Sequence, residues 1–538
     1  MPSDGGEGGL IITGLCGLDR CVCQPGQSSC SAGRAKACRA DGSGYVEFDC
    51  DPVQGMTCEP GGCKGPCAET WTAASYIGCD YYPTVTLNPV WSGFDFAVAV
   101  GNASEAPAHV TVTRGSTAVA TETVDRAGIQ IIKLPWVTEL KGGDVNACQS
   151  PPEPGNTRVV ADGAYRLRTD VPVTVYQFSP LTYEIAPVPV DCPVGTQCPG
   201  GLDPACKSFS NDASLLFPAN TLTGNYTGLS WPSGPKRAGF LAVTATEDDT
   251  DVEVTGHGTF APGGGVDAAG RGIVKLARGD VLELIAEHAQ PPQTYGSDLS
   301  GTLIRATHPV QVIGGHSCAN IPAATTGYCD HLEQALFPVE VLGKDYLVTY
   351  PAAVASESPH VIRIAAVSPD TTITFDPPIA PSTTLGPDDA VFQIDNVTKD
   401  VRIQADKAIL VAQYMQGSAS VPSGSGDPSM SLAIPSAQFR PNYVFVAPLT
   451  YDSNFVNVIA PRGTVVSVDG MTLATSEFAD IGASGFTVAR HQLTGGDVHK
   501  VAAMGGSVGI VVYGYGKDTS YMYPGGLDLK RITLPPVK

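Results

Sequence analysis

Two histidines and two cysteines near the middle of the chain have types and spacing that could support chemistry. His316, Cys318, Cys329 and His331 form a mirrored H-x-C-x10-C-x-H pattern. Thiolate and imidazole groups are the ligands that tetrahedral zinc favours, and a cysteine beside a histidine can be an activated nucleophile. The two cysteines can also form a disulfide, and disulfide sulfurs cannot act as thiolate ligands. The pattern therefore allows a disulfide, a zinc site or a catalytic cysteine.

The distribution of cysteines favours the disulfide. The chain has 16 cysteines, and ten of them lie between Cys16 and Cys79 at spacings that match no common zinc module. Such a pattern is typical of disulfide frameworks formed in an oxidising compartment. We therefore predict a Cys318–Cys329 bridge, which the chain-entropy model values at roughly 3 kcal/mol. Four further cysteines are predicted to cross-link an insertion: Cys148, Cys192, Cys198 and Cys206.

The residues around this bridge would then have structural roles. His316 and His331 become polar packing groups of the loop. Asp330 is expected to cap a short helical turn formed by DHLEQAL, because its carboxylate can accept from free backbone N–H groups.

Four carboxylates gather in one predicted hairpin turn. They are Glu247, Asp248, Asp249 and Asp251. Calcium is a hard cation that takes several carboxylate and carbonyl oxygens, so this turn is a candidate calcium site. It lacks the glycine-containing D-x-D-x-D pattern of dedicated calcium loops, which favours a solvated acidic turn. Calcium is the one candidate cofactor.

One serine has the spacing of a hydrolase nucleophile. The sequence GGSVG places Ser507 at the centre of a G-x-S-x-G pattern. A nucleophile elbow needs a strand, a sharp turn and then a helix, whereas Ser507 precedes the strand-like IVVYGYG. We therefore predict no catalytic residue.

The composition indicates many short elements in an exported protein. Hydrophobic residues make up 43% and charged residues 16%, with 61 Gly and 44 Pro for tight turns. The formal net charge of −21 would repel nucleic acid and anionic lipid headgroups. The sequence has no run of about 18 apolar residues, which is the length needed to span a membrane. The start, MPSDGGEGGLIITGLCG, lacks the features of a signal peptide. We expect an extracellular or cell-surface protein whose export signal is not part of this sequence.

Two strand patterns recur four times after the cysteine-rich start. The first is a hairpin with strict alternation, which begins at Phe96, Phe240, Val361 and Phe455. The second is a polar strand followed by a Val/Ile-rich strand, as in YRLRTDVPVTVYQFSP and KVAAMGGSVGIVVYGYG. Strict alternation buries one face of a strand and leaves the other wet, which suits antiparallel sheets packed face to face. The sequence therefore predicts tandem β-sandwich-like repeats.

The repeats set the predicted domain boundaries. A disulfide-rich module comes first, then a β repeat with a cysteine-stapled insertion, then three more β repeats. The predicted spans are 1–78, 79–210, 211–335, 336–432 and 433–538.

The region from about Cys79 to the C-terminus resembles the family named after the N-terminal domain of the IgGFc-binding protein. The residues that carry the resemblance are GCDYYPTVTLNPVW, LAVTATEDDTDVEV, CDHLEQALFPVEVLGKDYLVTYP and SYMYPGGLDL. The cysteine-rich module resembles those found ahead of such domains in bacterial surface proteins. The resemblance implies an extracellular, non-enzymatic protein with an adhesive or matrix-associated role. It provides no catalytic or ligand-binding residues to transfer.

The combined prediction is an all-β protein that acts through its surface in adhesion or recognition. Its expected partner is a protein or glycan surface ligand, or further copies of itself in a polymer. The first alternative is a structural subunit of a surface layer or extracellular fibre. The second is a hydrolase, based on Ser507 and the many carboxylates.

Overall fold

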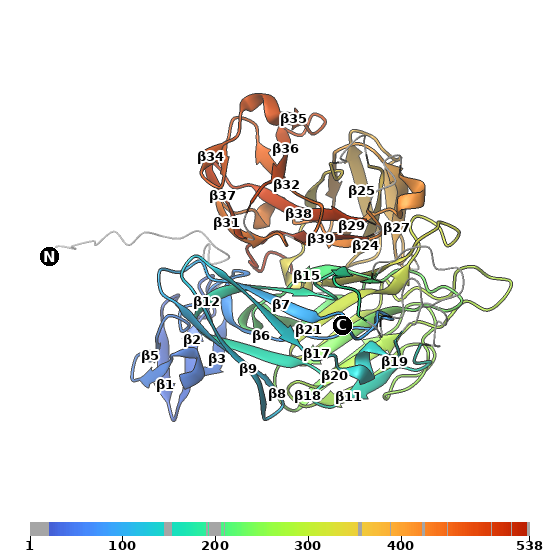
Figure 1. The fold of residues 1–538 in the computed structure, drawn as a ribbon. Coiled ribbons are helices and arrows are strands. Elements are labelled where there is room, and N and C mark those ends of the chain that lie inside the picture. Colours follow the sequence, from blue (N-terminus) through green and yellow to red (C-terminus); the bar gives the residue numbers. More distant parts are fainter. Residues whose placement is uncertain are drawn as a thin grey trace.

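The computed structural model contains almost entirely antiparallel β-structure, which confirms the predicted all-β class (Figure 1). It describes residues 21–144, 153–189, 192, 206–208, 210–352, 358–387, 389–421, 426–448, 450–495, 498–517 and 519–534. Among these residues, no helix has both the length and the apolar content needed to cross a bilayer.

The N-terminal module has little apolar core and depends on disulfides. Its elements are β1 (Ser28–Ser31), β2 (Arg34–Cys38), β3 (Tyr45–Asp49), η1 (Pro52–Gln54), β4 (Thr57–Glu59) and β5 (Gly62–Lys64). Phe48 stacks on Trp71 with ring centroids 4.8 Å apart, and few other large side chains are buried there. The described bridges are Cys23–Cys38, Cys30–Cys58, Cys50–Cys63 and Cys67–Cys79. The predicted disulfide-rich module is therefore confirmed.

The first two β units follow the module. The first contains β6 (Gly78–Tyr81), β7 (Phe96–Gly101), β8 (Ala108–Arg114), β9 (Thr117–Val124), β10 (Ile129–Leu134), α1 (Thr138–Lys141), β12 (Tyr165–Phe178), β13 (Glu184–Ile185), β14 (Cys206–Lys207) and β15 (Ala213–Leu215). The second contains β11 (Arg158–Val160), η2 (Ala219–Thr221), β16 (Thr223–Thr227), β17 (Gly239–Ala245), β18 (Thr250–Thr255), β19 (Arg271–Leu276), β20 (Val281–Ile285), β21 (Leu303–Ala319) and β22 (Asp330–Ala335).

The third and fourth units lie above the first two in Figure 1. The third contains η3 (Val339–Val341), β23 (Asp345–Val348), β24 (His360–Ala366), β25 (Thr371–Asp376), β26 (Thr383–Leu385), β27 (Phe392–Val397), β28 (Val401–Ala405), β29 (Ile409–Met415), η4 (Ser418–Ser420) and β30 (Met430–Leu432). The fourth contains η5 (Ser436–Gln438), β31 (Asn442–Val446), β32 (Ser453–Pro461), β33 (Val465–Val468), β34 (Met471–Thr472), η6 (Thr475–Glu477), β35 (Phe478–Asp480), β36 (Phe486–Leu493), β37 (Val498–Met504), β38 (Gly509–Gly516) and β39 (Thr519–Pro524).

The second recurring sequence pattern, a polar strand followed by a Val/Ile-rich strand, forms the strand that links the two halves of each unit. In the first unit, the start of β12 pairs with β6 and β8 and its end pairs with β7 and β15. The long β21 has the same role in the second unit. The third and fourth units divide this strand into β28 with β29 and β37 with β38, which lie in separate sheets. A turn at Gly505, which has a φ of 87°, makes the division in the fourth unit.

In each unit, one strand that comes after the linking strand lies at a central junction. β15, β22, β30 and β39 each pair with the end of the linking strand of their own unit. They also contact one another, with β15 beside β22 and β39, and β30 beside β22 and β39. One hydrophobic cluster accordingly runs from Tyr76 to Leu529, through all four units. A separate cluster fills the sandwich of the third unit.

The pairing of these strands supports a four-unit division. β22 and β30 end at residues 335 and 432, which are two of the domain boundaries predicted from the sequence. β15 lies after residue 210 but pairs with β12 of the first unit. We therefore propose the four units as described, with β15 in the first.

The chain between β10 and β12 of the first unit contributes a strand, β11, to the second unit, which places an arginine beside a buried glutamate. β11 precedes β12 in the chain but pairs with β20 of the second unit. Arg158 on β11 contacts the fully buried Glu283 on β20. Burial raises the pKa of Glu283 from 4.5 to about 7, although Arg158 lowers it. The Glu283 carboxyl, which lies between the two units, is therefore expected to titrate near pH 7.

Glu283→Gln should remove a pH dependence of stability. Because the folded pKa is raised, the stability contributed by Glu283 is fully present below the unfolded pKa and is lost as pH rises toward 7. The free energy of unfolding of the parent, relative to the variant, should fall by roughly 3 kcal/mol between pH 4 and pH 8. Urea unfolding at several pH values measures this difference. Glu105→Gln, at a side chain that is 96% exposed, is the control and should not change the profile. If the free energies of unfolding of the parent and of Glu283→Gln changed in parallel with pH, Glu283 would not titrate with a raised pKa in the folded protein.

Candidate functional site

The H-x-C-x10-C-x-H pattern forms a disulfide-closed hairpin. Cys318 lies near the end of β21, Cys329 directly precedes β22, and a disulfide joins them with a Cα–Cα distance of 5.1 Å. Both sulfurs are therefore unable to serve as zinc ligands or as a nucleophile. The two histidines are not brought to a shared metal position with these sulfurs. His316 Nδ1 accepts a hydrogen bond from the Cys318 N–H at 3.1 Å, and His331 belongs to a different network.

The predicted helical turn at Asp330 is wrong. Residues Asp330–Ala335 form β22, whose side chains are all buried. Pairing with β21 overrides the local preference for a cap and turn, because Gly315 lets β22 approach closely. A Cβ atom at Gly315 would overlap the carbonyl oxygen of Leu332.

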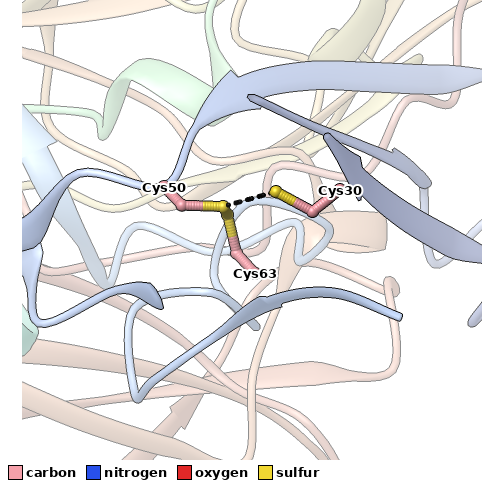
Figure 2. A group of neighbouring side chains, drawn as sticks. All are labelled: Cys30, Cys50 and Cys63. Atoms are coloured by element: carbon pink, nitrogen blue, oxygen red, sulfur yellow. Dashed lines mark hydrogen bonds between the residues drawn. A yellow bond between two sulfur atoms is a disulfide. The ribbon is translucent and has the colours of Figure 1, made fainter. Parts of the chain in front are cut away.

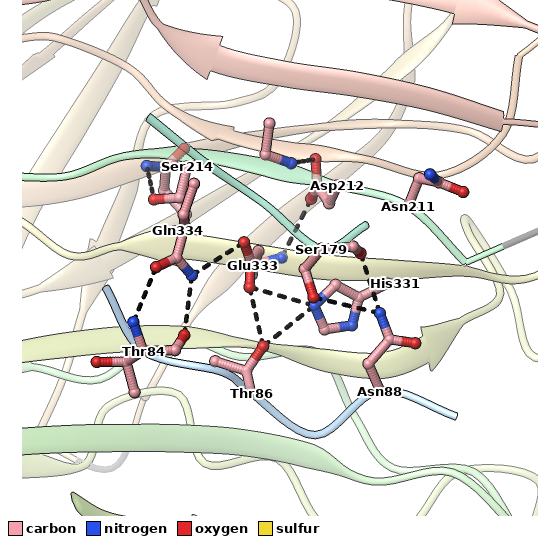
Figure 3. A network of polar contacts seen from close by, with 12 residues as sticks. Thr84, Thr86, Asn88, Ser179, Asn211, Asp212, Ser214, His331, Glu333 and Gln334 are labelled. Atoms are coloured by element: carbon pink, nitrogen blue, oxygen red, sulfur yellow. Dashed lines mark hydrogen bonds and ion pairs between the residues drawn. The ribbon is translucent and has the colours of Figure 1, made fainter. Parts of the chain in front are cut away.

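A buried polar network lies on β22 beside this hairpin (Figure 3). Glu333 accepts hydrogen bonds from Thr86 Oγ1 at 2.9 Å and from Gln177 Nε2 at 3.1 Å. His331 Nε2 lies 3.2 Å from Thr86 Oγ1. All four side chains are fully buried. The network therefore joins β22 of the second unit to two segments of the first.

Two buried carboxyls extend this network to the other units. Asp212 Oδ2 accepts from the backbone N–H groups of Glu333 at 3.1 Å and Met430 at 3.2 Å. Asp330 Oδ2 accepts from Thr519 Oγ1 at 3.2 Å. Burial raises the pKa of both carboxyls well above the ordinary aspartate value. Such shifts often occur at active sites. Here the carboxyl oxygens bind neighbouring strands, which indicates a structural role.

The four carboxylates of the candidate calcium turn interact with different groups of the protein. Lys275 Nζ lies 3.4 Å from Asp249 and 3.6 Å from Asp251. Asp248 accepts from a backbone N–H, and Glu247 lies 3.4 Å from His308 Nδ1. The turn does not assemble these oxygens into one cluster, and calcium binding there stays a prediction.

A group of sulfurs lies close enough to share a metal ion, but disulfides occupy it. Within the described ranges, this group is Cys30, Cys50 and Cys63 (Figure 2). Cys30 Sγ lies 3.3 Å from Cys50 Sγ, and each sulfur is already bonded within its own bridge. These sulfurs are therefore two neighbouring cross-links.

Ser507 lies outside the context of a nucleophile elbow. It occupies an exposed turn between β37 and β38, so a strand follows it instead of a helix.

In the insertion of the first unit, Cys192 and Cys206 form a disulfide with a Cα–Cα distance of 6.1 Å. Cys148 and Cys198 lie outside the described residues.

Removing the hairpin disulfide should destabilise the chain. Cys318→Ala with Cys329→Ala opens a loop of 11-residue separation, and we expect the free energy of unfolding to fall by about 3 kcal/mol. Urea unfolding measures the loss, and peptide mapping of the parent without reductant should recover the Cys318–Cys329 pair. A double variant with the same urea midpoint as the parent would show that the bridge adds nothing to stability.

Tandem antiparallel β units, two of which contain an internal disulfide, meet at a buried polar junction and define a multi-unit β-sandwich protein. The model of the IgGFc binding protein family matches residues 212–514, which is more than half of the chain. The chain therefore belongs to this family, as the sequence resemblance predicted. The match begins at Asp212 of the junction and includes the hairpin disulfide.

Comparison with known proteins adds one human relative. The IgGFc-binding protein of Homo sapiens is 30% identical over 171 residues, which cover 31% of this chain and 3% of that protein. The chain thus spans a small fraction of the length of its relative. A solved structure, the BSP domain of a biofilm associated protein, covers 86% of this chain and 97% of that one at 6% identity. Its TM-score of 0.12 is too low to carry an argument about fold or function.

Proposed function

We propose that the chain is an extracellular binding protein that acts in recognition or adhesion without catalysing a reaction. Membership of the IgGFc binding protein family is the observation that carries this proposal. The arrangement of the candidate site agrees with it. Cys318 and Cys329 are bonded to each other, and His331 and Glu333 are held in a buried network between units.

The disulfides support an extracellular location. Among the described residues, every cysteine is disulfide-bonded. Such a set is typical of proteins folded in an oxidising compartment. The net charge of −21 opposes binding to nucleic acid or to anionic membranes. The proposed partner is therefore a protein or glycan surface.

A binding assay tests the proposal. The chain would be immobilised and exposed to the Fc fragment of IgG, to a glycan array, and to a glycoprotein before and after enzymatic removal of its glycans. Saturable binding to one of these supports recognition, and loss of binding with the glycans assigns the ligand to sugar. The fully reduced chain is the control, because its module should lose the framework on which it depends. No saturable binding in any arm, together with turnover of a substrate, would contradict the proposal.

Self-association is the second arm of this test. Sedimentation velocity and electron microscopy across salt and calcium concentrations would detect polymers. A fibre or layer built from head-to-tail contacts would support a structural subunit instead. A monomer that binds a surface ligand supports recognition.

A further inference from the structure

A cleft of about 330 Å³ lies where the N-terminal module meets the first two β units. The module lines it with most of β3 and with Trp71, and the first unit adds Asp80 on β6 and Arg166 on β12. The second unit completes it with η2, with the turn between β17 and β18, and with Arg278. The volume falls in the range of small-ligand sites, roughly 300 to 1,000 Å³, which often lie between domains.

The carboxylates that line this cleft already have basic partners. The fifth of them, Glu247, lies 3.4 Å from His308 Nδ1. The other four form ion pairs with an arginine or a lysine: Glu47, Asp49, Asp51 and Asp80. These contacts use neither of the two remaining arginines of the cleft, Arg39 and Arg278. The acidic side chains of the cleft are therefore compensated without them.

The Arg278 side chain lines the cleft without a partner in the described part of the chain. It is half-buried, and its guanidinium forms neither a hydrogen bond nor an ion pair with any described residue. Asp248 accepts at 3.0 Å from the Arg278 backbone N–H and not from the side chain. Of the three guanidinium nitrogens only Nε is enclosed, so both terminal amino groups reach solvent. These groups form the planar pair of donors that binds a carboxylate in a bidentate manner.

Arg39 is a second arginine of the cleft whose charge has no counter-ion in contact. Its Nη1 donates to the Asn220 carbonyl at 3.4 Å, and within the described ranges its guanidinium forms no ion pair. Burial, and after it the charge of Arg531, lowers the pKa of Arg39 to about 10. Neither its Nε nor its Nη2 is among the enclosed atoms, so both can donate to a group in the cleft. The cleft therefore holds two positive charges that an anionic ligand would compensate.

The module side of the cleft adds hydrogen-bond acceptors and an aromatic ring. The Glu47 and Asp49 side chains are 50% and 61% exposed, so their oxygens keep lone pairs that accept from hydroxyl groups. Trp71 is half-buried and is held by Phe48, whose ring stacks on it at a centroid distance of 4.8 Å. A fixed aromatic ring beside polar groups suits the apolar face and the hydroxyl groups of a saccharide.

These groups together discriminate among anionic ligands. The carboxylates of the cleft would repel a polyanion rich in phosphate or sulfate, and a neutral saccharide would leave the arginine donors unused. An acidic peptide side chain supplies a carboxylate but no hydroxyl groups for Glu47 and Asp49. The net charge of −21 does not prevent binding of a single carboxylate, because salt screens charges beyond about 8 Å and the local arginines then dominate.

We propose that this cleft binds a sugar acid, a saccharide ring that carries one carboxylate among its hydroxyl groups. Arg278 and Arg39 donate to the carboxylate, the exposed carboxylates of the module accept from the hydroxyl groups, and Trp71 contacts the ring. The proposal rests on the proposed binding function and adds the class of ligand. A free monosaccharide and an acidic unit of a surface glycan both present this group.

Calorimetric titration of the chain with four probes tests the cleft. The probes are methyl glucuronide, its uronamide, sialyl-lactose, and an acetylated and amidated pentapeptide with a central glutamate. Methyl glucuronide should bind, and its amide should bind at least about tenfold more weakly, because it has the same ring without the charge. Binding of methyl glucuronide but not of sialyl-lactose assigns the cleft to a free sugar acid. Tighter binding of sialyl-lactose assigns it to an acidic unit of a glycan.

Three variants test the two arginines. Arg278→Gln and Arg39→Gln each remove a charged donor and should weaken binding of the acids by at least about tenfold. Arg271→Gln makes the same change at an exposed arginine of the second unit outside the cleft, and should leave binding unchanged. Thermal unfolding of each variant checks that it remains folded. The comparison of acid with amide on the parent chain tests the proposal even if a variant does not fold.

The outcomes separate this proposal from the proposed function. Failure of both sugar acids to bind at about 10 mM, equal binding of acid and amide, or unchanged binding in both Arg278→Gln and Arg39→Gln would overturn the cleft proposal. Binding of the glutamate peptide as tight as that of the sugar acids would also overturn it, in favour of a protein partner. Capture of a macromolecular partner by the same preparations would then leave the proposed function in place. Binding of a free sugar acid without any macromolecular partner would support the cleft and remove the wider function.

Discussion

Replacing Arg363 with methionine should lower the free energy of unfolding by roughly 3 kcal/mol at pH 7. Arg363 on β24 of the third unit is almost fully buried and forms an ion pair with Asp298 of the second. It also donates to the Ser230 carbonyl and lies over the Trp231 ring. Methionine fills similar space but leaves the Asp298 carboxylate without its counter-ion, at a side chain that is 25% exposed. Urea unfolding followed by circular dichroism measures the loss.

The pH dependence and a second substitution identify the cause. Burial acts to raise the pKa of Asp298, but Arg363 and Ser300 lower it overall. The stability from this pair is therefore present above the unfolded pKa and is lost as pH falls, so parent and variant should converge toward pH 3. Adding Asp298→Asn to Arg363→Met should restore part of the loss, because the unpaired charge is gone.

An exposed arginine provides the control for Arg363. Arg126→Met, at a side chain that is 72% exposed, should change the free energy of unfolding by less than about 0.5 kcal/mol. If Arg363→Met behaved like Arg126→Met, the contact between the second and third units would not depend on this ion pair.

The strands within each unit were largely predictable from alternation. The strands expected from Phe96 and Phe240 appear as β7 and β8 and as β17 and β18, since a two-residue period over several residues has few other solutions. Their predicted pairing as hairpins is wrong, because β12 lies between β7 and β8 and β21 lies between β17 and β18. The pairing of β11 with the second unit was not predictable. The three residues Arg158–Val160 carry no sequence feature that distinguishes pairing with β20 from pairing within their own unit. The error at Asp330 has the same origin, because the chain preference for a turn was overridden by the partner strand.

The candidate site was predictable only where its groups are close in sequence. Cys318 and Cys329 are separated by a short loop, and the composition of the chain was enough to favour their bridge. His331 and Glu333 lie beside Thr86 and Gln177, which are distant in the sequence and which only the folded chain brings to them. No spacing rule in the sequence expresses this proximity.

The junction left a sequence signal that periodicity alone does not detect. The segments DASLLFP, LEQALFP, SMSLAIP and SYMYP all pair a polar residue with a closing apolar residue and proline. The first three contain β15, the end of β22 and β30, and a 3-10 turn follows each of them, whereas SYMYP forms the end of β39. Read as repeats, they mark the strands where all units meet. Their polar residues supply the buried bonds, as Ser214 does by accepting from Gln334 at 3.0 Å.

Asp212→Ala should cause the largest loss at this junction, roughly 4 kcal/mol in the free energy of unfolding. The fully buried carboxyl accepts from the N–H groups of Ala213 at 2.9 Å, Glu333 at 3.1 Å and Met430 at 3.2 Å. These residues lie on β15, β22 and β30, so one side chain joins three units. Alanine leaves the donors unpaired, and each unpaired buried donor costs about 1 to 3 kcal/mol.

Asp212→Asn separates the role of the acceptor from that of the charge. Burial raises the folded pKa of Asp212 well above its ordinary value, against the effect of its N–H donors. Its contribution to stability is therefore present below the unfolded pKa of about 3.9 and is lost as pH rises through the folded pKa. The asparagine variant cannot ionise, so it should lose less than the alanine variant and show a flatter profile as pH rises.

Urea unfolding of the three proteins at pH 5, 7 and 9 measures both effects. Asp125→Ala is the matched control, because Asp125 is an exposed aspartate of the first unit. Its substitution should stay within about 0.5 kcal/mol of the parent. An Asp212→Ala variant as stable as this control would mean that the apolar contacts among β15, β22, β30 and β39 hold the four units together without the carboxyl. A large loss of stability in Asp212→Ala, with none in Asp125→Ala, would show that this buried acceptor holds the strands of the junction together.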